Sequence, residues 1–282
     1  MIGTLFLVAT PIGNLQDITL RAMETLRTVN LIACEDTRQT RKLLNAYGIS
    51  NKLISYHEHN EQARAEEFQK LLLDGKNIAL VTDAGTPGIA DPAFRAVRSA
   101  IEISANVVSI PGAVAFVSAL IISGLPTDAH FFGGFLPSKT GERRKRLQEA
   151  SNIQATLIFY ESPRRLKGSL KDCLEILGNR RAAVVRELTK MYEEIIRGEL
   201  QDLAEKFLNI EPRGEIVLVI DREDFLNPKS KIQNLKSLSE RVSELENQGF
   251  DNRAALKQAA REFGLARSEA YRQILMEKTL KN

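Results

Sequence analysis

The sequence predicts an α/β protein built from two domains and a small C-terminal helical module. The chain has 282 residues, more than one ordinary small domain needs. Short β-rich runs alternate with helical patterns over residues 1–126, and such alternation is typical of a largely parallel sheet. After Pro126 the spacing changes, so we expect a second α/β domain over 127–225 and a helical module over 226–282.

The first domain is expected to contain strands joined by helices. The strands are expected at residues 4–9, 31–34, 53–56, 77–81 and 106–110, and the helices at 20–26, 37–47, 62–73 and 92–101. Open sheets of this kind bind ligands in crevices at the carboxyl ends of their strands. The loops that follow these strands are therefore where we expect a site.

The second domain is expected to hold a mixed sheet. Its strands are expected at residues 131–134, 156–160, 181–187, 193–198 and 215–220, and its helices at 143–150, 164–177 and 200–208. Only a short link separates the third and fourth of these strands, which favours an antiparallel hairpin. A polar stretch beginning at Asp221 predicts a linker, and helical patterns follow near 234–247, 252–263 and 268–277.

The composition is that of a globular protein with a core, since 43% of the residues are hydrophobic and 27% are charged. The net charge of +3 decides nothing about partners by itself. Aromatic residues are few and Trp is absent, so the composition gives no sign of a base-stacking surface.

Cysteine usage and the apolar runs predict the compartment. Cys34 and Cys173 stand far apart without metal-ligand spacing, which favours a reducing compartment over a disulfide or a structural zinc. The N-terminal residues lack the basic start of a signal peptide. The apolar run 113–125 is shorter than the roughly 18–20 residues of a membrane span. We therefore expect a soluble, cytoplasmic protein without membrane contact.

Three loops rich in Gly and Pro follow strands of the first domain, at residues 10–14, 82–92 and 110–112. Glycine lets a backbone approach a ligand closely. None of the three loops matches the dinucleotide-binding or P-loop pattern. Any one of them alone is best interpreted as a tight turn, but three at one sheet edge favour a nucleotide-like ligand.

Longer blocks around these loops resemble the tetrapyrrole methylase superfamily. In the first domain they are ATPIGNLQDIT at 9–19, EDTRQT at 35–40 and DAGTPGIADP at 83–92. In the second they are GFLP at 134–137, FYESPRRL at 159–166, RELTK at 186–190 and GEIV at 214–217. The resemblance spans about residues 4–220 and extends more narrowly to members that methylate small-subunit ribosomal RNA.

The resemblance implies a class III methyltransferase fold, in which two α/β domains hold the methyl donor S-adenosylmethionine in the cleft between them. It also implies a homodimer that methylates the 2′-hydroxyl of a cytidine in the decoding region of 16S rRNA, either free or within the assembled small ribosomal subunit. The donor contacts implied by the family fall on Pro11, Gly13, Asp83, Ala84, Gly85, Ile89, Ala90, Pro111, Gly112, Ala113, Tyr160, Glu161 and Glu215. Members often have Ser or Cys where this chain has Val114, so a hydroxyl contact is impossible at that position.

The implied reaction needs a proton acceptor, because the sulfonium already activates the methyl group while the hydroxyl must lose its proton. Candidates for this general base at the strand ends are Glu35, Asp36, His57 and Glu58. Asp36 is at least as well explained as the N-cap of the following helix. His57 and His59 alternate, which is one feature of a metal site, but no third ligand is near in the sequence and we expect no metal.

Two basic clusters are candidates for contact with RNA phosphates. They are Arg143, Arg144, Lys145 and Arg146 in one expected helix, and Arg164 and Arg165 in the next. A solvated helix face is the alternative, but blocks of the resemblance flank both clusters, so we expect RNA contact. Arg38 is expected to meet a phosphate or an acidic partner. The pattern at 253–275 resembles a helix-turn-helix, and a packing or dimer element explains it almost equally well.

Two rival functions stay open on the sequence alone. One is a small-molecule methyltransferase of the tetrapyrrole or diphthine type, against which the basic clusters and the C-terminal helices favour a bulky anionic substrate. The other is a nucleic-acid-binding protein with a non-catalytic α/β body, which leaves the three glycine-rich loops without a role. The identity of the general base, the modified nucleotide and the state of the RNA also stay open.

Overall fold

The structure, a computed structural model, describes residues 1–222, 238–262, 265 and 270–272. Its first unit is built on a five-stranded sheet in the order β3-β2-β4-β1-β5. The strands are β1 (Thr4–Val8), β2 (Leu31–Cys34), β3 (Leu53–Ser55), β4 (Ile78–Val81) and β5 (Asn106–Ile110). All neighbouring strands pair in parallel, as the alternation of strands and helices predicts.

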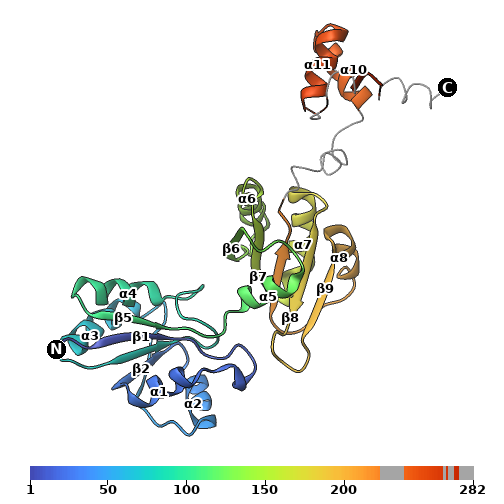
Figure 1. Ribbon diagram of the computed structural model, residues 1–282. Coiled ribbons are helices and arrows are strands. Elements are labelled where there is room, and N and C mark those ends of the chain that lie inside the picture. The colour runs from blue at the N-terminus through green and yellow to red at the C-terminus, as the bar shows by residue number, and fades with distance from the viewer. Residues whose placement is uncertain (223–237, 263–264, 266–269, 273–282) are drawn as a thin grey trace.

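Helices cover both faces of this sheet (Figure 1). They are α1 (Leu20–Thr28), α2 (Thr37–Ala46), α3 (Glu61–Leu73) and α4 (Ala93–Glu102), with a short 3-10 helix η1 (Leu15–Asp17) before α1. On one face α1 and α2 bury Leu26 and Leu44 in a cluster with Ile32. On the other face α3 and α4 form a cluster that includes Phe68 and Leu5. Burial on both faces explains why these strands appear in the sequence as short apolar runs.

The second unit is built on a mixed five-stranded sheet in the order β6-β7-β10-β8-β9. The strands are β6 (His130–Phe135), β7 (Thr156–Glu161), β8 (Arg181–Arg186), β9 (Glu194–Glu199) and β10 (Ile216–Ile220). β6 pairs with β7 in parallel and the other neighbours are antiparallel, so the predicted hairpin of β8 and β9 is confirmed. One face of the sheet is covered by α6 (Thr140–Ser151), α7 (Pro163–Leu177) and α8 (Leu200–Lys206).

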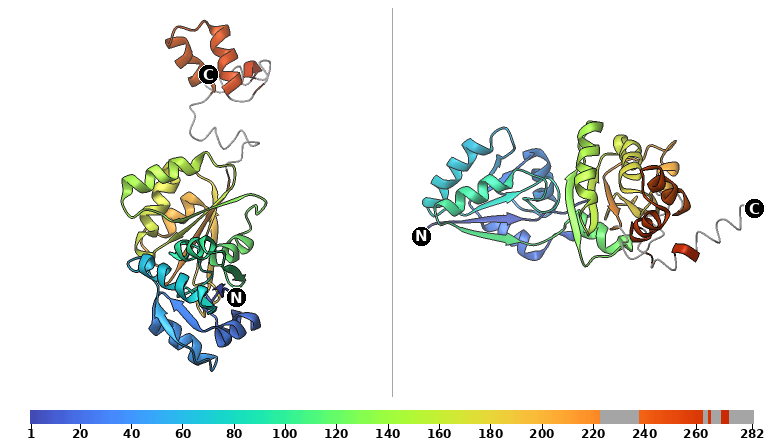
Figure 2. Two further views of the ribbon diagram at one scale, coloured as in Figure 1. Left: turned by 90° about the vertical axis from the view of Figure 1, so that its left-hand side faces the viewer. Right: turned by 90° about the horizontal axis from the view of Figure 1, so that it is seen from above.

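The opposite face of the second sheet is covered by α5 (Ala115–Ser123). Leu120 of this helix lies in one buried cluster with Ile158 and Val219 of the sheet. The apolar run 113–125 therefore contains a helix at the junction of the two units, which lie side by side in all views (Figures 1 and 2). Because α5 precedes the predicted domain boundary at residue 126, a boundary ahead of this helix agrees better with its packing.

The C-terminal region contains α10 (Leu238–Asn247) and α11 (Asn252–Glu262) among its described residues. The two helices pack through a small apolar cluster that includes Leu245, Ala255 and Ala259. Both were expected from the helical patterns, whereas the predicted linker and most of the third helix at 268–277 lie outside the described residues. Every helix in the described ranges is too short or too polar to cross a bilayer.

An ion pair buried between α6 and α7 corrects one expectation. The guanidinium of Arg143 lies 2.6 Å from the Asp172 carboxylate, and only 8% and 5% of these two side chains are exposed. Arg143 also donates hydrogen bonds to the Ser138 carbonyl and the Thr140 hydroxyl. The expected RNA contact is wrong for Arg143, because a buried guanidinium with these partners does not reach a phosphate.

Replacing Arg143 by Met should destabilise the fold. Asp172 would keep Arg144, 3.1 Å away, but would lose its buried partner, and breaking a buried pair costs about 3–5 kcal/mol. Since one partner remains, we expect a loss of about 3 kcal/mol in the free energy of unfolding, measured by urea denaturation. The control Lys145→Met, at an exposed position of the same helix, should change it by less than about 0.5 kcal/mol. Similar effects of the two variants would contradict the structural role of Arg143.

Candidate functional site

A cleft of about 470 Å³ opens where the two units meet. This volume is within the range of small-molecule sites, roughly 300–1,000 Å³. The first wall of the cleft comes from loops after β1, β2 and β4 and from the N-terminus of α5, and consists of Ile12, Glu35, Thr82, Ala84, Gly85, Thr86, Ile89, Ala90, Asp91, Val114 and Ala115. The second wall comes from β6, β7, β10 and adjoining residues, and consists of Phe135, Tyr160, Glu161, Ser162, Pro163, Gly214, Glu215 and Ile216.

The loop after β4 forms most of the first wall and is held at both ends. Gly85 exchanges two backbone hydrogen bonds with Thr10, of 2.9 and 3.1 Å, which join it to the loop after β1. The Asp91 carboxylate accepts a hydrogen bond of 2.8 Å from the backbone N–H of Gly88. Gly85 has φ 84° and Ala90 has φ 63°, a left-handed conformation that is strained for Ala. Such strain persists where surrounding contacts hold it, as they often do at binding sites.

Seven of the expected donor contacts line this cleft, and donor contact stays a prediction for them; they are Ala84, Gly85, Ile89, Ala90, Tyr160, Glu161 and Glu215. The expected contacts in the loop after β5, which are Pro111, Gly112 and Ala113, do not line the cleft. The Ala113 carbonyl accepts a hydrogen bond of 3.1 Å from the Thr86 hydroxyl. A Cβ atom on Gly112 would stand 2.8 Å from the Cβ of Ala9. Ala113 therefore supports the wall through Thr86, whereas Pro111 and Gly112 are exposed to solvent. Donor contact stays a prediction for all three.

Pro11 and Gly13 do not line the cleft either; Pro11 is buried, and Gly13 lies where the two units touch. A Cβ atom on Gly13 would stand 2.5 Å from Cγ of Lys190. The neighbouring Asn14 donates its backbone N–H to the Thr189 hydroxyl at 3.1 Å. The small residue at position 13 is thus explained by close contact between the units.

Two polar networks hold the second wall. In the first, Lys190 lies 2.8 Å from both Glu187 and Glu215, and its hydrogen bond lowers the pKa of Glu187. Gly214 has φ 90°, and a Cβ atom there would overlap the Glu187 side chain. Glu215 therefore borders the cleft from a position fixed by Lys190.

In the second network the carboxylate of Glu161 is buried, so the predicted donor contact of this residue would have to come from its backbone. It lies 2.6 Å from Arg165 and also accepts a hydrogen bond from the Ser169 hydroxyl. Beside it, burial raises the pKa of Tyr160, so the phenol stays protonated at neutral pH. Arg165, expected to bind RNA, is occupied by Glu161 and by the Leu136 carbonyl.

Acidic side chains gather at the first wall. Partial burial and the negative charges of Asp83 and Asp91 raise the pKa of Glu35. Asp83 does not line the cleft, but its carboxylate accepts the backbone N–H of Asp36 at 3.0 Å and so joins the loops after β2 and β4. A cleft with this charge favours a cationic ligand, and a carboxylate with a raised pKa is suited to accept a proton.

The other candidates for the general base do not line the cleft. Asp36 caps α2, because its carboxylate accepts the backbone N–H of Arg38 at 2.8 Å, and the hydrogen bond from the Arg38 side chain lowers the pKa of Asp36. His57 faces Asn60, with 3.2 Å between His57 Nε2 and Asn60 Nδ2. The N-cap interpretation of Asp36 is confirmed, and neither residue is placed to act on a ligand in the cleft.

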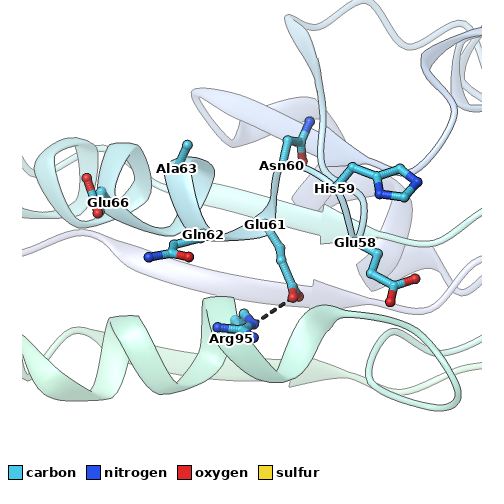
Figure 3. A pocket seen from close by; sticks show the side chains of 8 residues that line it. All are labelled: Glu58, His59, Asn60, Glu61, Gln62, Ala63, Glu66 and Arg95. Atoms are coloured by element: carbon cyan, nitrogen blue, oxygen red, sulfur yellow. Dashed lines mark ion pairs between the residues drawn. The ribbon is translucent and has the colours of Figure 1, made fainter.

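Glu58 belongs to a separate pocket at the start of α3 (Figure 3). It is exposed there next to His59, and the ion pair of Glu61 with Arg95, 2.6 Å long, forms another side of the pocket. Within the described ranges no three His, Cys, Asp or Glu side chains gather in a way that could hold a metal ion. Glu58 therefore lies apart from the cleft.

The remaining basic candidates differ in what they contact. Arg38 pairs with Asp36, Arg144 with Asp172 and Glu175, and Arg146 with Glu149. Lys145 and Arg164 are exposed, and neither forms an ion pair with another described residue. Arg164 directly follows Pro163 of the second wall. Arg164 is consequently the basic candidate best placed to meet an anion at the rim of the cleft.

Several lining residues were missed although the blocks that contain them were recognised. Ser162 and Pro163 lie in the block at 159–166, and Phe135 lies in the block GFLP. Thr82 and Asp91 belong to the loop after β4. Each of these residues stands next to a recognised residue, and that proximity was the signal in the sequence. The sequence does not show which side chain faces the cleft, because this depends on the local backbone conformation.

Comparison with known proteins identifies the family. The model of the tetrapyrrole (corrin/porphyrin) methylases matches residues 4–204. The ribosomal RNA small subunit methyltransferase I of Halalkalibacterium halodurans is 46% identical, and that of Bacillus subtilis 43%; each match covers 95% of this chain and 93% of the relative. The crystal structure of uroporphyrin-III-C-methyltransferase from Thermus thermophilus superposes with a TM-score of 0.56 and a sequence identity of 17%. The match covers 78% of this chain and 94% of that protein's chain. A likeness at this identity shows the fold alone.

The family model covers most of the two units, and the two relatives extend over nearly the whole chain. The chain therefore belongs to the tetrapyrrole methylase family and, within it, to the ribosomal RNA small subunit methyltransferase I group.

Proposed function

We propose that this chain transfers a methyl group from S-adenosylmethionine to the 2′-hydroxyl of a cytidine in the decoding region of 16S rRNA. The observation that carries the proposal is the cleft, which has an acidic, glycine-rich wall on one side and the exposed Arg164 next to the other. The names of relatives that match 95% of the chain support ribosomal RNA as the substrate. We include in the proposal a cytoplasmic homodimer that acts on 16S rRNA, either free or within the small subunit.

The cleft fits S-adenosylmethionine in size and charge. Its volume of about 470 Å³ is that of a small-molecule site, and the carboxylates of Glu35 and Asp91 suit a cationic sulfonium. The backbone around Gly85 and Ala90 would hold the donor at the first wall, and Tyr160 would border it from the second. Bound there, S-adenosylmethionine supplies a methyl group that is already activated for transfer.

Glu35 is the residue to which we assign the role of general base. It is the one member of the predicted set of bases that lines the cleft. The ribose hydroxyl must lose a proton, which Glu35 would accept directly or through one water molecule. Partial burial and the charges of Asp83 and Asp91 raise the pKa of Glu35, which strengthens it as a base once it is ionised. The two walls would orient the hydroxyl and keep bulk water out.

The reaction itself is tested with the full chain, labelled S-adenosylmethionine and 16S rRNA from a strain that lacks the gene. Free rRNA and assembled small subunits are the two substrates, and ribose methylation is then mapped. We expect label on the 2′-oxygen of one decoding-region cytidine. Intact donor binding with no label in either RNA sample would contradict the proposal and favour a small-molecule substrate.

Gly85→Ala should weaken donor binding at least about tenfold in a calorimetric titration. The added Cβ would stand 3.3 Å from Ile12 and would be strained at φ 84°, so this part of the wall must shift. The matched control is Gly48→Ala, which has φ 62° with open space around it and lies after α2, away from the cleft. Both variants place a Cβ atom at a positive φ, so equal donor affinities would remove Gly85 from the donor site.

Glu35→Gln should lower the single-turnover methylation rate about 100-fold or more, the range for a lost general base. The wild-type rate should fall as the pH drops through a pKa that lies above the ordinary 4.5 of Glu, because the carboxylate is the active form. The variant should lose this dependence while keeping its affinity for donor and RNA. Glu58→Gln, in the separate pocket, is the control and should keep the wild-type rate and profile. A near-normal rate for Glu35→Gln would mean that positioning alone drives the transfer.

A further inference from the structure

The strand β6 contains an extra residue at its carboxyl end. Phe132 is opposite Ile158, and Phe135 is opposite Tyr160. The two pairs are therefore three residues apart along β6 but only two residues apart along β7. Gly134 takes up the extra length in a left-handed conformation, φ 67°, with open space around it. This is a β-bulge, a feature that often redirects a side chain next to a functional site.

The bulge decides which way Phe135 points. Successive side chains of a strand face opposite sides of the sheet, and Phe131 packs with the cluster under α6 while Phe132 stacks on Phe116 of α5, with 4.3 Å between ring centroids. A regular strand would put Phe135 on the side of Phe131. The extra residue puts it on the side of Phe132, where its ring centroid lies 5.4 Å from that of Tyr160 in an edge-to-face arrangement.

The ring of Phe135 is left open to solvent in this position. It lines the cleft, and 58% of the residue is exposed, whereas Phe132 and Tyr160 are partly buried in the cluster beneath α5. Ligand clefts are lined largely by hydrophobic and aromatic side chains. Phe135 therefore offers an aromatic face that no other described residue covers.

The charges on the two walls indicate what covers this face. Glu35 and Asp91 on the first wall favour a cationic ligand, whereas Arg164 beside the second wall is exposed and forms no ion pair with a described residue. An exposed ring on a wall and an exposed arginine that directly follows a residue of the same wall can together bind an unstacked base and its phosphate in single-stranded RNA.

We propose that an unpaired base of the RNA substrate stacks on Phe135, with an adjoining phosphate at Arg164. This inference rests on the proposed function, because it names how the RNA enters the same cleft. It assigns specificity for single-stranded RNA to the second wall and donor binding to the first.

The test compares Phe135→Leu, which removes the aromatic face, with Phe135→Tyr, which keeps it. We expect kcat/KM for the RNA to fall about tenfold to a hundredfold in Phe135→Leu, as for the loss of one base-stacking contact, with the donor affinity unchanged. Phe135→Tyr should restore the wild-type value. The control Phe94→Leu removes another exposed ring, 69% exposed, on α4 and should have no effect.

A second readout is independent of methyl transfer. Binding of a short single-stranded RNA that contains 2-aminopurine should quench its fluorescence by stacking in the wild type and in Phe135→Tyr, but not in Phe135→Leu; the chain has no Trp to interfere. Arg164→Gln should lower the slope of log affinity against log salt by about one. An unchanged kcat/KM together with unchanged quenching in Phe135→Leu would overturn the inference.

Two further outcomes separate this inference from the proposed function. If Phe135→Leu lowers donor affinity by the same factor as kcat/KM, the ring belongs to the donor site and the inference is wrong. If the wild type methylates no RNA, the proposed function fails, and the quenching experiment still decides whether Phe135 stacks on a base.

Discussion

The geometry of the cleft depends on one contact, in which the loop after β1 packs against the second unit. Ile12 is buried in one cluster with Val185 and Val217 of the second sheet, and Gly13 lies against Lys190. The two sheets have separate cores, so nothing within either core sets the distance between the walls. The contact of Ile12 and Gly13 with the second unit sets the distance between the walls, and α5 lies in the chain segment that connects the two units.

The two walls are built by different means. The first presents backbone in constrained conformations, held by the pairing of Thr10 with Gly85 and by the Asp91 carboxylate. The second presents side chains, and each is fixed by a neighbour, as Glu215 is by Lys190. Backbone contacts tolerate changes of side chain, whereas the shape of the second wall changes with every substitution.

The sequence predicts the fold closely because its strands are buried on both faces and bounded by Gly and Pro. The bounds of β2 and β5 were predicted to the residue, and the glycine-rich loops were placed at the edge where the cleft lies. Single residues were harder. The basic run at 143–146 gives no sign that Arg143 is buried, since its partner Asp172 is 29 residues away. The helix α5 was missed because its run is apolar on all sides, without the periodicity that marks a surface helix.

The extra residue in β6 has a consequence for how proteins of this fold can diverge. Which face of the sheet Phe135 occupies depends on the bulge, because three residues after Phe132 a regular strand would place the ring on the opposite face. A deletion of Gly134 would leave two steps along β6 matching two along β7, so the bulge would disappear while the ring stays opposite Tyr160. A substitution at Gly134 that disfavours its left-handed conformation, φ 67°, would instead weaken the bulge that keeps the ring in the cleft. The backbone conformation at this one position can therefore decide whether an aromatic surface faces the cleft, while the percentage identity of the aligned proteins hardly registers it.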